Sequence, residues 1–356
     1  MDVRQLDVRQ ALTRIAELDP RLCAFLEVWE GAAPVPGDRE LPLHGVPFAV
    51  KGPSGIRSYA ARRLIAAGAV PVGSTSVPGP GTYWQTWGLG ARGRTLNPYR
   101  ADRTPGGSSA GSAVAVAAGM VPLATGSDGA GSIRIPAAWC GVFGLRTTRG
   151  LLPSPDRTAL ATAGVLGRSA AELETYLGCV VDGYASLSEP ADLPTSAVWS
   201  ADLGFAAGPD LDPEVVAVAR HAAERILTLE DPPEGFALLD PKEEWFAIRG
   251  GARPGAVAAE NTARLDQLFS RTRLLATPTT PYPPHGHEGP GGRFSTALTW
   301  AFNVSGHPAV SIPAGFTPDG CPVGLQLVSD FGGEALLARA AAAVPPWPLP
   351  LASSHG

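Results

Sequence analysis

The sequence predicts an α/β fold in which helices cover a β-sheet. Short apolar runs that indicate strands alternate with segments of helical periodicity, and this alternation is typical of the class. The 356 residues are 44% hydrophobic and 17% charged, so the chain can bury a large core. Chemically distinctive residues far apart in the sequence must meet at one site. This favours a single domain that comprises residues 1–356.

The N-terminal third is expected to alternate helices and strands. Helical periodicity runs through residues 3–27, within an N-terminal helical segment of about 1–30, and residues 31–40 read as a loop. Residues 48–50 are a short apolar run that predicts a strand ending at Lys51. The elements expected next are a helix over 62–69 and a strand over 70–73.

The rest of the chain continues the same alternation. Small apolar side chains lie on every side of segment 113–120, so this helix should be buried all round. Ser169 and Glu172 form a capping box that opens a helix to about residue 181. Asp212 followed by Pro213 opens another helix, to about residue 227. The remaining elements expected are strands over 274–278 and 309–312 and a last helix over 332–343.

Lysine is almost absent from this chain, which carries only Lys51 and Lys242 beside 26 arginines. Arginine does not lose its proton in a protein, whereas a desolvated lysine can become the neutral amine of a general base. Lys51 lies in an otherwise apolar run, residues 45–52. It is therefore a candidate base, with a snorkelling lysine at a strand end as the structural alternative.

A glycine- and serine-rich stretch follows, over residues 105–136. Its glycines lack Cβ atoms, so the backbone can aim successive N–H groups at one point, as an oxyanion hole requires. Ser132 comes directly after such glycines and is placed to attack a carbonyl. Ser108 could pass the proton of Ser132 to an amine base. Asp128 and Arg134 read as braces for this loop.

Three other motifs suggest different chemistry. Residues 107–111 also match the G-x-S-x-G elbow of α/β-hydrolases, with Ser109 as the nucleophile, but the polar, proline-broken segment before them does not read as the required strand. Residues 88–93 match a dinucleotide-binding fingerprint without a helix to follow. His285 and His287 lie in a Pro/Gly loop without partners at metal-ligand spacing, so no metal site is predicted there.

The stretch from Gly106 to Leu145 resembles the amidase signature family. It runs from Gly-Gly-Ser-Ser through Gly-Ser-Ile-Arg to Cys-Gly and Gly-Leu, in the family's order and at about the family's length. Further segments that resemble the family are residues 97–98, 164–169, 303–313 and 324–326. The resemblance covers most of the chain and implies a single α/β/α domain built on a mixed, many-stranded sheet.

The family uses a Ser-cisSer-Lys triad, and its two serines are separated as here, by 132 − 108 = 24 positions. The resemblance implies that Ser132 is the nucleophile, Ser108 the bridging serine and Lys51 the base. It also implies that Gly129, Ala130, Gly131 and Ser132 supply the amides of the oxyanion hole. Ser109, Asp128 and Arg134 are expected to support the loop that carries them. Trp84, Trp87 and Trp300 are candidates for an aromatic substrate pocket, with core packing as the alternative.

This sequence departs from the family's pattern at three places. Gly52 follows Lys51 where the family usually has aspartate, which affects how the lysine is held. The segment from Lys51 to Ser108 is shorter than usual, and the variable region at about 186–253 is reduced. These two shortenings affect the substrate entrance, so we expect a shallow pocket or a homodimer whose partner covers the site.

Composition excludes several classes of function. A formal net charge of −5, without a cluster of basic residues, argues against nucleic-acid partners. The start lacks the apolar core of a signal peptide and no apolar run reaches membrane-spanning length, so we expect a cytoplasmic protein without membrane association. Four widely spaced cysteines predict reduced thiols and no disulfide framework.

The sequence therefore predicts an amide-bond hydrolase that forms an acyl-enzyme and needs no metal or organic cofactor. Its expected partner is a small-molecule amide substrate. Three alternatives remain open: a glutaminase-type subunit of an amidotransferase, an enzyme that transfers the acyl group to an amine, and a non-catalytic relative.

Overall fold

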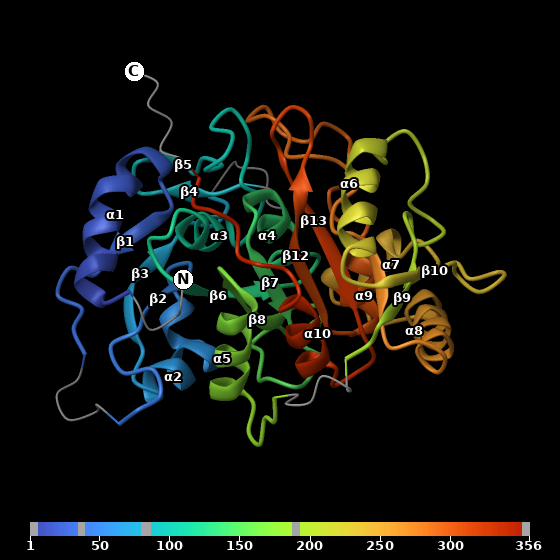
Figure 1. Ribbon diagram of the computed structural model, residues 1–356, viewed down its shortest axis with the longest axis horizontal. Coiled ribbons are helices and arrows are strands. Elements are labelled where there is room, and N and C mark those ends of the chain that lie inside the picture. Colours follow the sequence, from blue (N-terminus) through green and yellow to red (C-terminus); the bar gives the residue numbers. More distant parts are fainter. Residues whose placement is uncertain (1–5, 35–39, 80–86, 187–192, 351–356) are drawn as a thin grey trace.

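A computed structural model describes residues 6–34, 40–79, 87–186 and 193–350. Within these residues, eleven strands form one mixed sheet with helices on both faces (Figure 1). The predicted α/β class with a central mixed sheet is confirmed. The strands lie in the order β1 (Phe25–Val28), β3 (Val70–Thr75), β2 (Pro47–Lys51), β6 (Leu123–Asp128), β8 (Thr162–Gly167), β7 (Phe143–Arg146), β12 (Ala309–Phe316), β13 (Pro322–Val328), β11 (Leu275–Pro278), β9 (Ser196–Trp199) and β10 (Thr228–Glu230).

The sheet changes character along its width. Strands β3, β2 and β6 run parallel to one another. The centre, from β6 through β8, β7, β12 and β13 to β11, is antiparallel. Strand β9 then pairs in parallel with both β11 and β10. Parallel strands require crossover connections, and between β2 and β3 the chain supplies a helix for that purpose.

The helices divide between the two faces of the sheet (Figure 1). On one face, the sheet forms an apolar core with α2 (Tyr59–Ala66), α5 (Ala170–Val180), α6 (Pro213–Glu224) and α10 (Glu334–Ala341). A second core, on the other face, is shared with α1 (Val8–Leu22), α3 (Ala110–Ala117) and α4 (Arg134–Cys140). Three more helices lie toward the β10 end: α7 (Lys242–Arg249), α8 (Ala256–Phe269) and α9 (Trp300–Ser305).

Strand β2 shows how the two cores fix the direction of side chains. Phe48 and Val50 belong to the core under α2, whereas Ala49 belongs to the core under α3. Side chains alternate along a strand, so Lys51 leaves on the same face as Ala49, toward α3. Helix α3 is buried on all sides, as its composition predicts.

Most predicted elements are confirmed with shifted ends, but the first helix is shorter than expected. Helix α1 ends at Leu22, and residues 25–28 form strand β1. Cys23 adopts a left-handed conformation, with φ of 52°. The carboxylate of Asp19 accepts hydrogen bonds from the amides of Ala24 and Phe25, at 2.6 and 3.0 Å. This local capping ends the helix although apolar periodicity continues.

Three other expectations can be compared with the structure. Residues 89–94 form a two-stranded hairpin, β4 (Leu89–Gly90) and β5 (Gly93–Arg94), as expected of a turn and not of a cofactor loop. The cysteines are free, and Cys179 is only half-buried. In the part of the chain that the structure describes, no helix combines the length and the apolar character needed to cross a membrane.

Two helical glycines give a matched test of the packing around α3. A Cβ atom at Gly111 would overlap the carbonyl oxygen of Ala24 and the amide of Ser76, whereas one at exposed Gly178 on α5 would meet nothing within 4 Å. We predict that Gly111→Ala lowers the free energy of unfolding by about 1–3 kcal/mol. Gly178→Ala should raise it by about 0.5–1 kcal/mol, because alanine favours the helix. Urea denaturation measures both, and equal effects would contradict this description of α3.

Candidate active site

Lys51 ends strand β2, and its side chain reaches polar groups of the glycine- and serine-rich stretch. Its Nζ lies 2.9 Å from Ser108 Oγ and 3.0 Å from both the carbonyl oxygen and the Oγ of Ser127. Its backbone amide donates to Thr125 Oγ1 at 3.2 Å. Residues 51, 108 and 127 thus meet from three segments. The ammonium form of Lys51 satisfies all three acceptors, and the neutral amine has a lone pair that can accept the Ser108 proton.

Burial lowers the pKa of Lys51 to about 8, while the nearby negative charge of Asp128 opposes this shift. An ordinary lysine has a pKa near 10.5, so its neutral form is scarce at neutral pH. About one tenth of Lys51 would be neutral at pH 7 with the lowered value. The environment of Lys51 therefore suits a general base.

Gly52, where the family usually has aspartate, turns the chain directly after Lys51. Its φ is +65°, and its amide donates to the carbonyl oxygen of Thr75 at 2.9 Å. Glycine adopts this left-handed conformation without steric cost. A backbone turn therefore follows the lysine at this position.

Two serine-bearing loops lie side by side next to Lys51. The peptide bond between Gly107 and Ser108 is cis. The amide of Ser109 donates to the carbonyl oxygen of Ser132 at 3.2 Å, which joins the two loops. Ser108 and Ser132 are partly exposed, whereas Ser109 is fully buried. The structure thus brings Lys51 into contact with Ser108, holds the loop of Ser132 against the residue that follows Ser108, and keeps the hydroxyl of Ser109 away from solvent.

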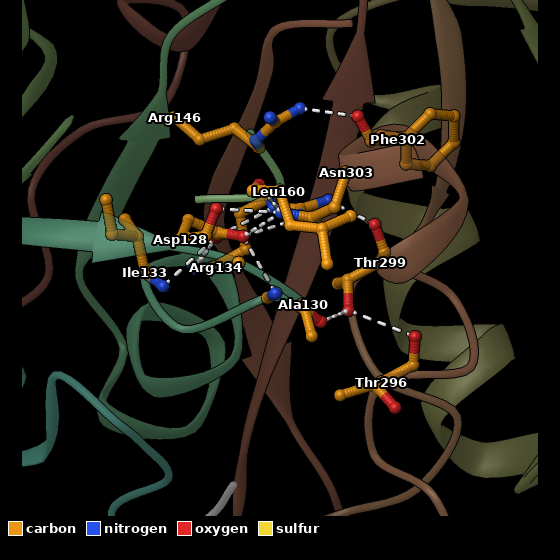
Figure 2. A network of polar contacts seen from close by, with 12 residues as sticks. Asp128, Ala130, Ile133, Arg134, Arg146, Leu160, Thr296, Thr299, Phe302 and Asn303 are labelled. Carbon is orange, nitrogen blue, oxygen red and sulfur yellow. Dashed lines mark hydrogen bonds and ion pairs between the residues drawn. The ribbon is translucent and has the colours of Figure 1, made fainter. Parts of the chain in front are cut away.

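The Asp128 carboxylate shapes the loop that carries Ser132. It accepts from the amides of Gly131 at 2.7 Å, Ile133 at 3.1 Å and Arg134 at 3.3 Å (Figure 2). Gly131 was expected to supply an oxyanion-hole amide, but its N–H is directed to Asp128 instead. The amides of Gly129, Ala130 and Ser132 donate to no acceptor within the described residues.

A fully buried ion pair lies beneath this loop. Arg134 Nη2 is 2.8 Å from Asp128 Oδ1, and both side chains are 0% exposed. Arg134 Nε also donates to Asp128 Oδ2, at 3.0 Å. Burial alone would raise the pKa of Asp128, but the Arg134 guanidinium holds that pKa well below its usual range. The Asp128 carboxylate is therefore ionised at neutral pH.

The remaining N–H groups of Arg134 connect the pair to the far half of the sheet. Its Nη1 donates to Gln326 Oε1 at 2.7 Å and to the carbonyl oxygen of Thr299 at 3.0 Å, and its Nη2 donates to Asn303 Oδ1 at 2.6 Å. Asn303 Nδ2 in turn donates to both the backbone and the side chain of Asp128, at 2.8 and 2.9 Å. Figure 2 shows Asn303 and Thr299 approaching the loop from α9. Asp128 and Arg134 thus occupy the position that a loop brace requires.

Sequence reasoning did not assign roles to four residues that hold the loop. Asn303 and Gln326 lie in segments that resembled the family, which was the only signal for them. Thr299 Oγ1 donates to the carbonyl oxygen of Ala130 at 2.5 Å, and Trp245 Nε1 donates to that of Gly129 at 2.8 Å. No motif marked Thr299 or Trp245, because each acts on a loop more than 100 positions away.

The three candidate pocket tryptophans have different surroundings. Trp84 lies outside the described residues. Trp87 is half-buried, and the Arg94 guanidinium lies 5.7 Å from its ring centroid. Trp300 is buried in an apolar cluster with Ala130 and Trp245, and its ring lies 5.6 Å from that of Phe294. Of the described pair, Trp300 is therefore the one that packs against the glycine-rich loop.

The histidine pair considered in the sequence lies apart from these contacts. His285 Nδ1 bonds to the carbonyl oxygen of Gly286 at 2.6 Å, and His287 Nε2 bonds to that of Ala101 at 2.9 Å. Both histidines thus bond to the backbone of loops. Their bonding is that of loop residues.

Comparison with known proteins gives a consistent picture. A family model described as Amidase matches residues 53–228 and 255–338. The putative amidase AmiA2 of Mycobacterium bovis is 31% identical over 430 aligned positions, which cover 94% of this chain and 88% of that protein. The acylamidase of Rhodococcus erythropolis is 30% identical, with 87% of this chain and 83% of that protein covered.

Solved structures show the same architecture. A 6-aminohexanoate cyclic dimer hydrolase superposes with a TM-score of 0.74 at 25% identity, covering 94% of this chain and 91% of that one. The native peptide amidase from Stenotrophomonas maltophilia superposes with a TM-score of 0.70 at 23% identity, covering 98% of each chain. The second likeness concerns the fold alone.

The buried ion pair can be tested against an exposed one. Arg134→Met would leave the Asp128 charge buried without its partner, so we predict a loss of about 3–5 kcal/mol in the free energy of unfolding. The control Arg220→Met removes an ion pair with Glu224 that is about half exposed, and should change it by less than about 1 kcal/mol. Urea denaturation compares the two. A loss in Arg134→Met no larger than the control's would contradict the bracing role.

Proposed function

The chain belongs to the amidase family, whose members are hydrolases acting on carbon–nitrogen bonds, and from this premise we propose that it cleaves an amide through an acyl-enzyme on Ser132. Ser108 bridges the nucleophile to Lys51, which is the base. The observation that carries this proposal is the contact of 2.9 Å between Lys51 Nζ and Ser108 Oγ, at a lysine whose pKa is lowered to about 8.

In the acylation step, neutral Lys51 accepts the proton of Ser108 while Ser108 accepts that of Ser132. Ser132 Oγ forms a bond to the amide carbonyl carbon, and the carbonyl oxygen gains the negative charge. When the tetrahedral intermediate collapses, the C–N bond breaks and the leaving nitrogen receives a proton from Ser108, which Lys51 reprotonates. Water then repeats the sequence on the ester, releasing the acid and restoring Ser132.

The oxyanion is proposed to bind the amides of Gly129, Ala130 and Ser132. Gly131 is not included, because its amide donates to Asp128. Removal of one oxyanion-hole donor typically costs about 10²–10³ in rate, so the position of these amides contributes substantially to the rate. Trp245 fixes the carbonyl oxygen of Gly129, which orients the peptide group that carries the Ala130 N–H. Thr299 fixes the carbonyl oxygen of Ala130, in the peptide group whose N–H, that of Gly131, is bonded to Asp128.

The substrate is proposed to be a small-molecule amide with an apolar acyl group. Trp300 and the half-buried Phe294 pack together beside Ala130, so apolar side chains lie next to the loop where the carbonyl would bind. Related proteins are described as an acylamidase and as a 6-aminohexanoate-cyclic-dimer hydrolase, which also fit small amides. A screen of anilides that carry different aliphatic and aryl acyl groups would identify the preferred acyl group.

The nucleophile is tested by covalent labelling. Ser132→Ala should abolish labelling by a fluorophosphonate probe and lower kcat by at least about 10⁴-fold, because the attacking oxygen is removed. Ser109→Ala is the matched control, since its hydroxyl is buried and its backbone contact to Ser132 is kept. Labelling that survives in Ser132→Ala and disappears in Ser109→Ala would assign the nucleophile to the other serine.

The base is tested by the pH dependence of hydrolysis. The required form of Lys51 is the neutral amine, so kcat/KM for an uncharged anilide should rise with pH and level off above an apparent pKa of about 8. Lys51→Met should lose most of the activity, and any activity that remains should not rise with pH in this way. A profile that is flat from pH 6.5 to 9.5, or a limb that persists in Lys51→Met, would exclude the lysine base.

A further inference from the structure

Three segments distant in sequence place possible metal ligands at one point. His307 follows α9, Asp266 lies in the last turns of α8, and Asp330 follows β13. One ligand atom from each side chain, an imidazole nitrogen and two carboxylate oxygens, lies within 4.8 Å of the other two. His307 is fully buried, whereas both aspartates are exposed.

The imidazole of His307 has an unused nitrogen. Its Nδ1 bonds to Ser305 Oγ at 3.0 Å, but its Nε2 is buried and has no hydrogen-bond partner in the described part of the chain. The ring is held between Phe331 and Phe269, with centroids 4.2 and 5.5 Å away. A buried polar atom without a partner is uncommon in folded proteins and requires an explanation.

One property of His307 fits a metal ligand in particular. The bond from Nδ1 to Ser305 fixes the orientation of the ring, as outer-shell partners of metal-bound histidines do. The ring is thus held in place before any ligand arrives.

We propose that His307, Asp266 and Asp330 bind a divalent transition-metal cation such as Zn²⁺. One imidazole and two carboxylates form a ligand set that suits Zn²⁺ and its neighbours, with water completing the coordination, whereas Mg²⁺ and Ca²⁺ prefer oxygen ligands alone. Metal–ligand bonds are about 2.0–2.2 Å long. The exposed aspartate side chains can rotate relative to the fixed imidazole to reach this geometry.

Binding would join α8 and the segment after β13 to the end of α9, the helix that supports the loop of Ser132. The carbonyl oxygen of His307 accepts from Arg146, and Arg149 donates to the carbonyl oxygens of Val304 and Ser305 at the end of α9. The same helix carries Asn303, which bonds to Asp128. A cation would therefore clamp α9 to α8 and to the segment after β13. It has no place in the proposed hydrolysis, and the proposal does not depend on that reaction.

Calorimetric titration of the metal-free full chain with Zn²⁺ tests the site. We expect one equivalent to bind and to raise Tm, and we expect Mg²⁺ to do neither. Asp266→Asn and Asp330→Asn should each weaken Zn²⁺ binding at least tenfold, and His307→Gln should abolish it. The matched controls Asp231→Asn and His221→Gln, both at exposed positions, should bind as the wild type does.

The two aspartate variants keep the test decisive even if His307→Gln fails to fold, because their side chains are exposed. Absence of Zn²⁺ binding by the wild type would overturn the proposal. Binding that is unchanged in both aspartate variants, or that is lost in His221→Gln, would overturn it as well, since the cation would then be held elsewhere.

Discussion

The buried pair of Asp128 and Arg134 is the constraint on which the rest of the site depends. Both charges are removed from water, so each must be fully satisfied by the other and by neighbouring polar groups. Asp128 meets this demand by binding three backbone amides of the loop that carries Ser132. Arg134 meets it with groups from α9 and β13. The position of the loop is thus set by the need to neutralise two buried charges.

The end of strand β6 positions both the proposed base and the loop of the proposed nucleophile. Ser127 and Asp128 are adjacent at the end of β6: Ser127 accepts two hydrogen bonds from Lys51 Nζ, and Asp128 holds the loop of Ser132. Because β6 pairs in parallel with β2, which ends at Lys51, both carboxyl ends reach the same edge of the sheet. The order of two neighbouring strands therefore places the lysine beneath the serines.

The sequence was informative where a residue's function has a local signature. The isolated Lys51 and the capping box at Ser169 are such signatures: Lys51 contacts Ser108, and the capping box is present. It failed where tertiary contacts decide. The Asp19 carboxylate ended α1 early, Asp128 captured the amide of Gly131, and Trp245 reached Gly129 from more than 100 positions away. Central strands such as β7 and β13, which contain glycine and are buried along their whole length, also lacked the alternation that marks half-buried strands.

Trapping the acyl-enzyme tests the central claim most directly. Wild-type protein is mixed with a nitrophenyl ester whose acyl-enzyme deacylates slowly, and the reaction is quenched in acid during the burst. Proteases that cut before aspartate and after arginine then release residues 128–134, which separates Ser132 from Ser108 and Ser109. The acyl mass is predicted on the peptide of residues 128–134, in one equivalent. An acyl mass on the peptide of residues 104–127, or turnover without any acylated peptide, would contradict the mechanism.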